Sequence, residues 1–184
     1  MWMIRVVLRL LILGLVACHG IAAELEVDKS VSKVFAEVKA SPPHSFEVVV
    51  TDFESVLSID DSGAMTAARF TFDFADLDSD SNKRDSKMRS WMNVELNPVV
   101  EFVLEKTETR EEGLVAIGEL VMHGVSRQIE IPYSSRENQG KWILEGDVVL
   151  DHQEWGLEIV KLLFFRVKPK LGIRIHIEGV THSE

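Results

Sequence analysis

Histidine, serine and aspartate are the side chains of this 184-residue chain that could carry out catalysis or bind a metal. Imidazole is a common ligand for zinc and copper, and a histidine beside a serine hydroxyl can act as a general base. The histidines after His19 never occur at the i, i+2 or i+4 spacing that puts two ligands on one face; they are His44, His123, His152, His176 and His182. A metal site would therefore have to be assembled by the fold, and none is predicted. Ser126 follows His123 at a spacing that is common by chance, so no catalytic residue is predicted either.

The acidic string Asp76–Ser81 is similar to the start of a calcium-binding loop, in which alternate carboxylates surround one cation. Its sixth position is Ser81 instead of Gly and its twelfth is Lys87 instead of Glu. We interpret the string as a solvated loop. The sequence also contains no Gly-x-Ser-x-Gly elbow, phosphate loop, dinucleotide fingerprint or His-Glu-x-x-His helix. Enzymatic activity is thus the weaker hypothesis, and no cofactor is predicted.

Large apolar side chains form a second set with functional potential, because at strand or helix spacing they could line a solid core or a ligand cavity. We expect the following ten to line a cavity: Phe70, Phe72, Phe74, Met88, Trp91, Met92, Val100, Phe102, Leu120 and Ile175. Burying an alkyl chain contributes about 0.8 kcal/mol per CH₂, so a lipid is the ligand class that such an interior favours. Periodicity alone does not separate a cavity from a filled core.

The elements that must position these residues are mainly strands. After Glu24, apolar residues recur at every second position, as in Val34/Ala36/Val38 and Phe46/Val48/Val50, which is the pattern of half-buried strands. Turn sequences separate the runs at 60–63, 111–113 and 138–140, and each ends in glycine. One segment, about 82–92, breaks the period and predicts a short helix with Asn82 as its N-cap. The sequence therefore predicts an antiparallel sheet of roughly seven to nine strands, which removes its edges by closing into a barrel.

The first 23 residues contain Arg5 and Arg9, then an uncharged apolar stretch and small residues, which is typical of a secretory signal peptide. We expect a signal peptide over 1–23, one domain over 24–184, and a periplasmic or secreted protein. The alternative is a lipoprotein anchored through Cys18, which follows Leu-Val-Ala. No apolar stretch is long enough to span a bilayer. With 20 Lys and Arg against 30 Asp and Glu, the chain lacks the basic character of a nucleic-acid-binding protein.

Three blocks of the sequence are more specific than any of these patterns. The first is Lys83–Trp91 followed by Pro98–Phe102, in which an Arg-Asp pair and a helix precede a Pro and a Phe that open a strand. The second is Gly118–Ile129, with Met-His-Gly-Val-Ser at its centre, and the third is Leu150–Leu157, which ends in an aromatic-Gly turn. Together they resemble the YceI-like family, over roughly residues 24–180.

This resemblance implies an all-β fold: an eight-stranded antiparallel lipocalin-like barrel with the short helix inserted between strands. Members of the family hold polyisoprenoids, isoprenoid quinones or fatty amides in an elongated cavity, so the partner implied is an apolar lipid. Arg84 and His123 are the two polar side chains expected to contact a headgroup, with a structural ion pair as the alternative role for Arg84.

The leading hypothesis is a non-enzymatic carrier or sequestering protein of the bacterial envelope that binds a polyisoprenoid or isoprenoid quinone. One alternative is an enzyme or redox accessory that acts on such a bound lipid. Another is a stress protein with a filled core and a protein partner. Each of these hypotheses is compatible with a homodimer.

Overall fold

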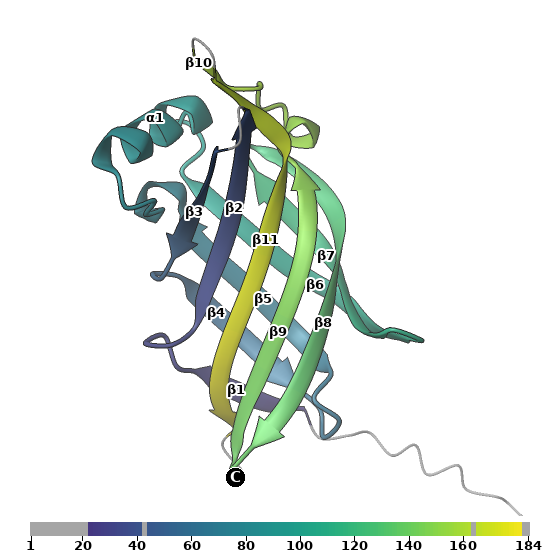
Figure 1. Cartoon of the computed structure of the whole chain (residues 1–184). Helices are drawn as coiled ribbons and strands as arrows, with labels where there is room; N and C mark the ends of the chain where they lie inside the picture. Colours follow the sequence, from purple (N-terminus) through teal and green to yellow (C-terminus); the bar gives the residue numbers. More distant parts are fainter. Residues whose placement is uncertain (1–21, 42–43, 163–164, 182–184) are drawn as a thin grey trace, which may run out of the picture.

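Residues 22–41, 44–162 and 165–181 are the part of the chain that this computed structural model describes, and they contain eleven strands, one α-helix and two 3₁₀ helices (Figure 1). The strands are β1 (Ala23–Val27), β2 (Lys33–Ser41), β3 (His44–Val50), β4 (Glu54–Ile59), β5 (Met65–Asp73), β6 (Val99–Arg110), β7 (Gly113–Met122), β8 (Val125–Asn138), β9 (Lys141–Asp151), β10 (Lys161–Leu162) and β11 (Phe165–Thr181). The helices are η1 (Phe74–Asp76), α1 (Asn82–Met92) and η2 (His152–Trp155). None of the helices in these described ranges is both long and apolar enough to cross a membrane.

The sheet closes into a barrel with eight strand positions. Its order is β1–β4–β5–β6–β7–β8–β9–β11, and β1 pairs back onto β11, with every pairing antiparallel. β2 continues along β11 beyond β1, and β3 pairs with β2, so β1/β2 and β3/β4 each fill one position of the ring. The prediction of an eight-stranded antiparallel barrel with a short helix is confirmed. Closure pairs the backbone hydrogen-bonding groups at both edges of the sheet, which would otherwise be exposed.

The predicted turns join neighbouring strands as expected. Residues 60–63 connect β4 to β5, and Gly63 adopts φ 81°. A Cβ at that position would lie 2.4 Å from the Trp142 ring, so only glycine fits there. At the β8–β9 turn, Gln139 and Gly140 both have positive φ, 55° and 80°, which is the type I′ geometry that matches the twist of a hairpin.

Helix α1 lies at the end of the barrel where β10 also lies (Figure 1). Its N-cap is Ser81 and not Asn82, and the Ser81 hydroxyl makes no capping hydrogen bond. The loop before the helix is fixed instead by buried Asp85, which accepts hydrogen bonds from the backbone N–H of Ser79, at 3.1 Å, and from the Ser79 hydroxyl. The helix ends at Asn93, whose left-handed conformation, φ 54°, lets its N–H donate to two carbonyls of the last turn.

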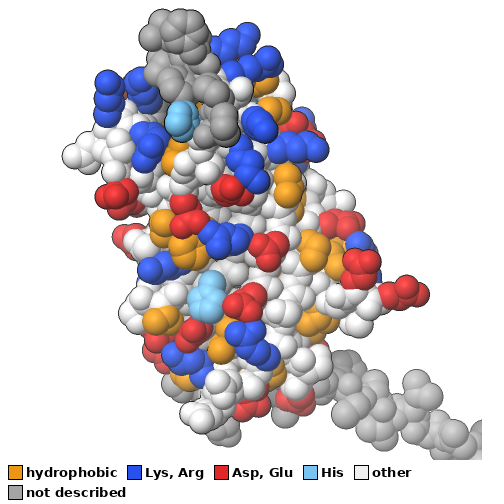
Figure 2. Space-filling view, viewed as in Figure 1, with side chains coloured by type: hydrophobic (Ala, Val, Ile, Leu, Met, Phe, Trp, Pro, Cys, Tyr) orange, Lys and Arg blue, Asp and Glu red, His pale blue; other side chains and the backbone are white. Residues whose placement is uncertain are grey.

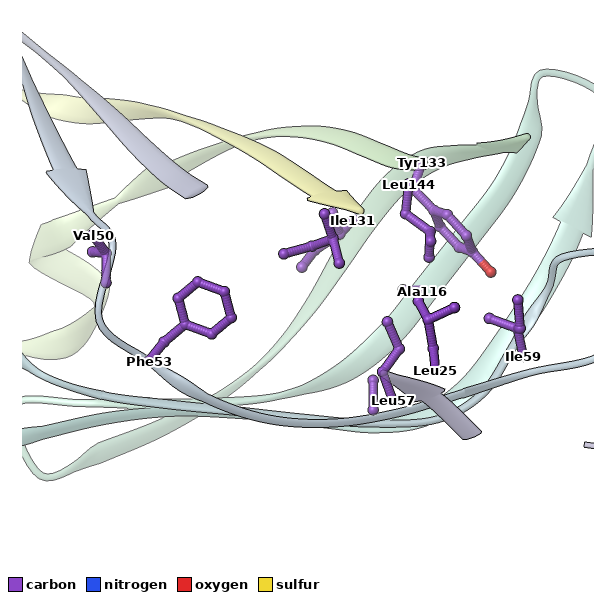
Figure 3. Close-up of a cluster of buried hydrophobic side chains, with 11 residues drawn as sticks. Leu25, Val50, Phe53, Leu57, Ile59, Ala116, Ile131, Tyr133 and Leu144 are labelled. Carbon is purple, nitrogen blue, oxygen red and sulfur yellow. The ribbon is translucent and has the colours of Figure 1, made fainter. Parts of the chain in front are cut away.

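Two clusters of buried side chains stabilise the barrel. The first lies toward the end that carries β1, where inward-facing side chains of facing strands meet (Figure 3); it comprises Leu25, Val50, Phe53, Leu57, Ile59, Ala68, Ala116, Ile131, Tyr133, Leu144 and Ile177. The Tyr133 hydroxyl there accepts a hydrogen bond from the Met65 N–H at 2.8 Å. The second cluster joins α1 and η2 to the barrel wall and comprises Phe74, Met92, Val100, Leu120, Met122, Trp155 and Leu157.

Candidate functional site: an apolar cavity in the barrel

The inner faces of the strands enclose a cavity of about 580 Å³, a volume typical of small-molecule sites. The cavity wall is almost entirely apolar. It is formed by every second residue of the strands that the period-two pattern predicted. Examples are Val34, Ala36 and Val38 of β2 with Ile173 and Ile175 of β11. Successive side chains of a strand point to opposite faces, so the alternation in the sequence becomes an apolar lining inside and a polar surface outside.

Nine of the ten side chains expected to line a cavity do so: Phe70, Phe72, Phe74, Met88, Trp91, Val100, Phe102, Leu120 and Ile175. Met92 is the exception, since it is fully buried in the second cluster beside Trp155. It follows Trp91 directly, and one residue turns an α-helix by about 100°, so the two side chains leave α1 in different directions. This placement corrects the grouping of Met92 with Met88 and Trp91.

Several polar residues of the cavity wall lie at one end, where α1 and the start of β3 lie. Lys83 and Lys87 of α1 and His44 of β3 are exposed and line the cavity, which therefore reaches the surface at this end. We call this opening the mouth. Lys83 and Lys87 were not among the predicted site residues, although their i, i+4 spacing on the predicted helix places them on one face.

Arg84 also lines the mouth, but most of its guanidinium is already engaged within the protein. Its Nε donates to the Ser79 hydroxyl at 2.9 Å and its Nη2 to the Ser79 carbonyl at 2.5 Å. The guanidinium lies 4.3 Å from the centroid of the Phe46 ring, which is a cation–π distance. Arg84 thus anchors the loop before α1 to the cavity wall, and no carboxylate of the described residues lies within 4.0 Å of it.

His123, the other expected headgroup contact, is not part of the cavity wall. It occupies the β7–β8 turn with φ 51°, and its Nδ1 donates to the Trp155 carbonyl at 3.1 Å. Its ring therefore positions the aromatic-Gly turn of η2 and does not contact the interior. Arg84 and His123 do not converge on one point of the cavity.

His152 takes the place in the wall that was expected for His123. Its side chain is fully buried, and the Trp91 ring meets it edge-on at 5.1 Å between centroids. Its Nδ1 donates to the Leu157 carbonyl at 3.2 Å, while its Nε2 has no hydrogen-bond partner within the described part of the chain. Burial lowers the pKa of His152, which favours the neutral form of the ring. Nothing in the spacing of the histidines indicated this position.

His176 lies on the outer wall with its two ring nitrogens 3.3 and 3.0 Å from carboxylate oxygens of Glu145 and Glu178. Within residues 22–41, 44–162 and 165–181, no three His, Cys, Asp or Glu side chains come together as metal ligands would. Cys18 and His182 lie outside these ranges, as does nearly all of the expected signal peptide.

A family model described as the YceI-like domain matches residues 25–179. The chain belongs to the YceI-like family. This assignment agrees with the three sequence blocks, which form α1 with the start of β6, the β7–β8 hairpin, and the end of β9 with η2. No curated protein sequence matches the chain.

Several solved structures share the barrel of this YceI-like chain. BcnA of Burkholderia cenocepacia has a TM-score of 0.75 at 18% identity, over 84% of this chain and 100% of its own. A polyisoprenoid-binding domain from Saccharophagus degradans has a TM-score of 0.67 at 10% identity, over 87% and 99%. The Campylobacter jejuni YceI protein has a TM-score of 0.62 at 15% identity, over 74% and 85%. At such identities the likeness concerns the fold.

Proposed function

We propose that this YceI-like protein binds a long apolar lipid, of the polyisoprenoid or isoprenoid-quinone class, inside the barrel and acts as an envelope carrier or sequestering protein. The observation that carries the proposal is the cavity of about 580 Å³, whose wall is almost entirely apolar and whose mouth is lined by Lys83, Lys87 and His44. Membership in the YceI-like family and the fold shared with the polyisoprenoid-binding domain from Saccharophagus degradans support it.

The size of the hydrophobic term explains why a long ligand is required. Each buried CH₂ contributes about 0.8 kcal/mol, while association costs on the order of 4–15 kcal/mol. Burying a chain of roughly 20 carbons contributes about 16 kcal/mol. After an association cost of about 8 kcal/mol, a net binding free energy of about 8 kcal/mol remains, which corresponds to a Kd of about 1 μM. Short isoprenoids would therefore bind weakly and long ones tightly.

We further propose that the protein works outside the cytoplasm, in the periplasm or as a secreted protein, with lipidation of Cys18 as the alternative. The apolar stretch between Arg9 and His19, followed by Ala22 and Ala23, supports export. A carrier in an aqueous compartment between membranes would need an interior of this kind, because a free isoprenoid is insoluble in water.

The test is to purify the chain without detergent, compare its native and denatured masses, and extract bound lipid. A recurrent added mass that extracts as an isoprenoid or quinone is expected. The stripped protein is then titrated with a short and a long isoprenoid quinone while the fluorescence of Trp91 in the wall is followed, with Trp91→Phe to identify that signal. Absence of added mass together with failure to bind the long quinone would contradict the proposal.

An enzyme or redox accessory acting on the bound lipid is less well supported by the geometry. That alternative required Arg84 and His123 to converge on the ligand, and only Arg84 lies in the wall. The filled-core alternative requires side chains to occupy the interior, and the barrel has a cavity there.

A further inference from the structure

Two segments that flank the mouth carry a large share of the positive charge. Helix α1 and residues 159–170 together contain eight Lys or Arg and a single acidic residue, the buried Asp85. The basic residues are Lys83, Arg84, Lys87, Arg89, Lys161, Arg166, Lys168 and Lys170. The rest of the sequence contains 12 basic and 29 acidic residues. An acidic protein therefore has one basic end.

The basic residues of this end differ from those of the barrel wall in their partners. Elsewhere in the described chain, seven of the ten basic side chains lie within 4.0 Å of a carboxylate: Lys39, Arg69, Lys106, Arg110, Arg136, Lys141 and Arg174. The other three, Lys29, Lys33 and Arg127, do not. Six side chains near the mouth have no such carboxylate among the residues that the structure describes: Lys83, Lys87, Lys161, Arg166, Lys168 and Lys170. Five of the six are exposed lysines and the sixth is an exposed arginine.

These unpaired charges border the opening on both sides. Lys83 and Lys87 line the mouth directly from α1. On the other side, Val160 and Val167 line the cavity and are joined by a backbone hydrogen bond of 3.0 Å, and the cations at 161, 166 and 168 are their immediate or near neighbours. Figure 2 shows Lys and Arg gathered over the end that carries α1 and β10, whereas acidic and basic side chains alternate on the wall below.

We propose that this basic end docks the mouth onto a bilayer that carries anionic phospholipid headgroups, so that the lipid ligand passes between bilayer and barrel. The inference rests on the proposed function, since a mouth that faces a membrane is useful only to a protein that exchanges lipid. Each Lys or Arg near an anionic leaflet raises partitioning about fivefold at moderate ionic strength. The acidic remainder of the molecule is repelled by the same surface, and this repulsion orients the mouth toward it.

The test is flotation of the purified protein without its expected signal peptide, residues 24–184, with two kinds of vesicles, one of phosphatidylcholine alone and one with roughly one third phosphatidylglycerol. The reversal variant Lys161→Glu/Lys168→Glu changes two exposed side chains that do not line the cavity. The control Lys29→Glu/Lys33→Glu changes net charge equally, at the β1–β2 connection away from the mouth. Each variant is also titrated with the long isoprenoid quinone.

We expect the wild type to float with the anionic vesicles only, and to be released as salt rises from about 0.05 to 0.5 M. The reversal variant should partition at least about 25-fold less than the wild type, on the basis of about fivefold per residue, while the control variant matches the wild type. Equal binding to both vesicles, no flotation, or equal loss in both variants would overturn the docking proposal. Failure of the quinone titration in the wild type would instead count against lipid binding itself.

Discussion

Replacing Phe102 by alanine separates a ligand cavity from a filled core. Phe102 of β6 stands between Phe70 of β5 and Leu120 of β7 in the register of the sheet, and its half-buried ring lines the cavity. In a filled core, Phe→Ala costs about 3–5 kcal/mol. Because one side of this ring faces the cavity and not protein atoms, we expect about half of that, roughly 1.5–2.5 kcal/mol, in lipid-free protein.

The same substitution should weaken lipid binding by a free energy comparable to its cost in stability. Removing the ring takes away on the order of 60–80 Å² of apolar contact with a bound chain, or about 1.5–2 kcal/mol, which is a 10- to 30-fold loss of affinity. The assays are urea unfolding of stripped protein, followed by circular dichroism, and titration with a long isoprenoid quinone.

Met92→Ala is the matched control for this experiment. Met92 is fully buried and does not line the cavity, so its truncation should cost about 2–5 kcal/mol of stability and leave the quinone affinity unchanged. The reasoning is refuted if Phe102→Ala loses the full 3–5 kcal/mol while its quinone affinity equals that of the wild type.

Three further predictions follow from single contacts. Ala36→Trp, which places an indole in the cavity wall, should abolish binding of the long quinone in the same titration while thermal unfolding changes little. Asp85→Ala removes a buried acceptor of two hydrogen bonds and should cost about 2–4 kcal/mol in urea unfolding, whereas Ala at exposed Asp76 should cost less than about 0.5 kcal/mol. Burial lowers the pKa of His152, so the unfolded chain binds a proton near pH 6.5 that the folded chain does not, and stability should fall as pH drops below about 6.5. His152→Asn, whose amide can still donate to the Leu157 carbonyl, should flatten the urea midpoints between about pH 7.5 and 5.5, and an unchanged slope would contradict this origin.

The sequence predicted the side chains of the cavity wall better than its polar groups. Phe70, Phe72 and Val100 could be assigned because a strand has a period of two, and a closed barrel has only one inside for its apolar face. His123 was expected to contact the ligand but lies outside the cavity wall. It occupies a turn, and the side-chain direction of a turn residue cannot be read from a strand or helix period. Its ring direction depends on the Trp155 carbonyl, which lies 32 residues away in sequence.

The distribution of charge illustrates the same limit. Lys83 and Lys87 are visible in the sequence as an i, i+4 pair on a helix, and Lys161, Arg166 and Lys168 as a basic run. Their shared position at the mouth is not visible, because it depends on where α1 and β10 lie relative to the ring.

The sequence by itself determined the strands, the turns at 60–63, 111–113 and 138–140, the helix, and the apolar face, because each of these depends on neighbours within a few residues. The tertiary structure alone decided that the interior holds a cavity and not a solid core. That outcome depends on the summed volumes of side chains from eight strand positions, and on the way the clusters around Tyr133 and around Met92 fill only part of the barrel.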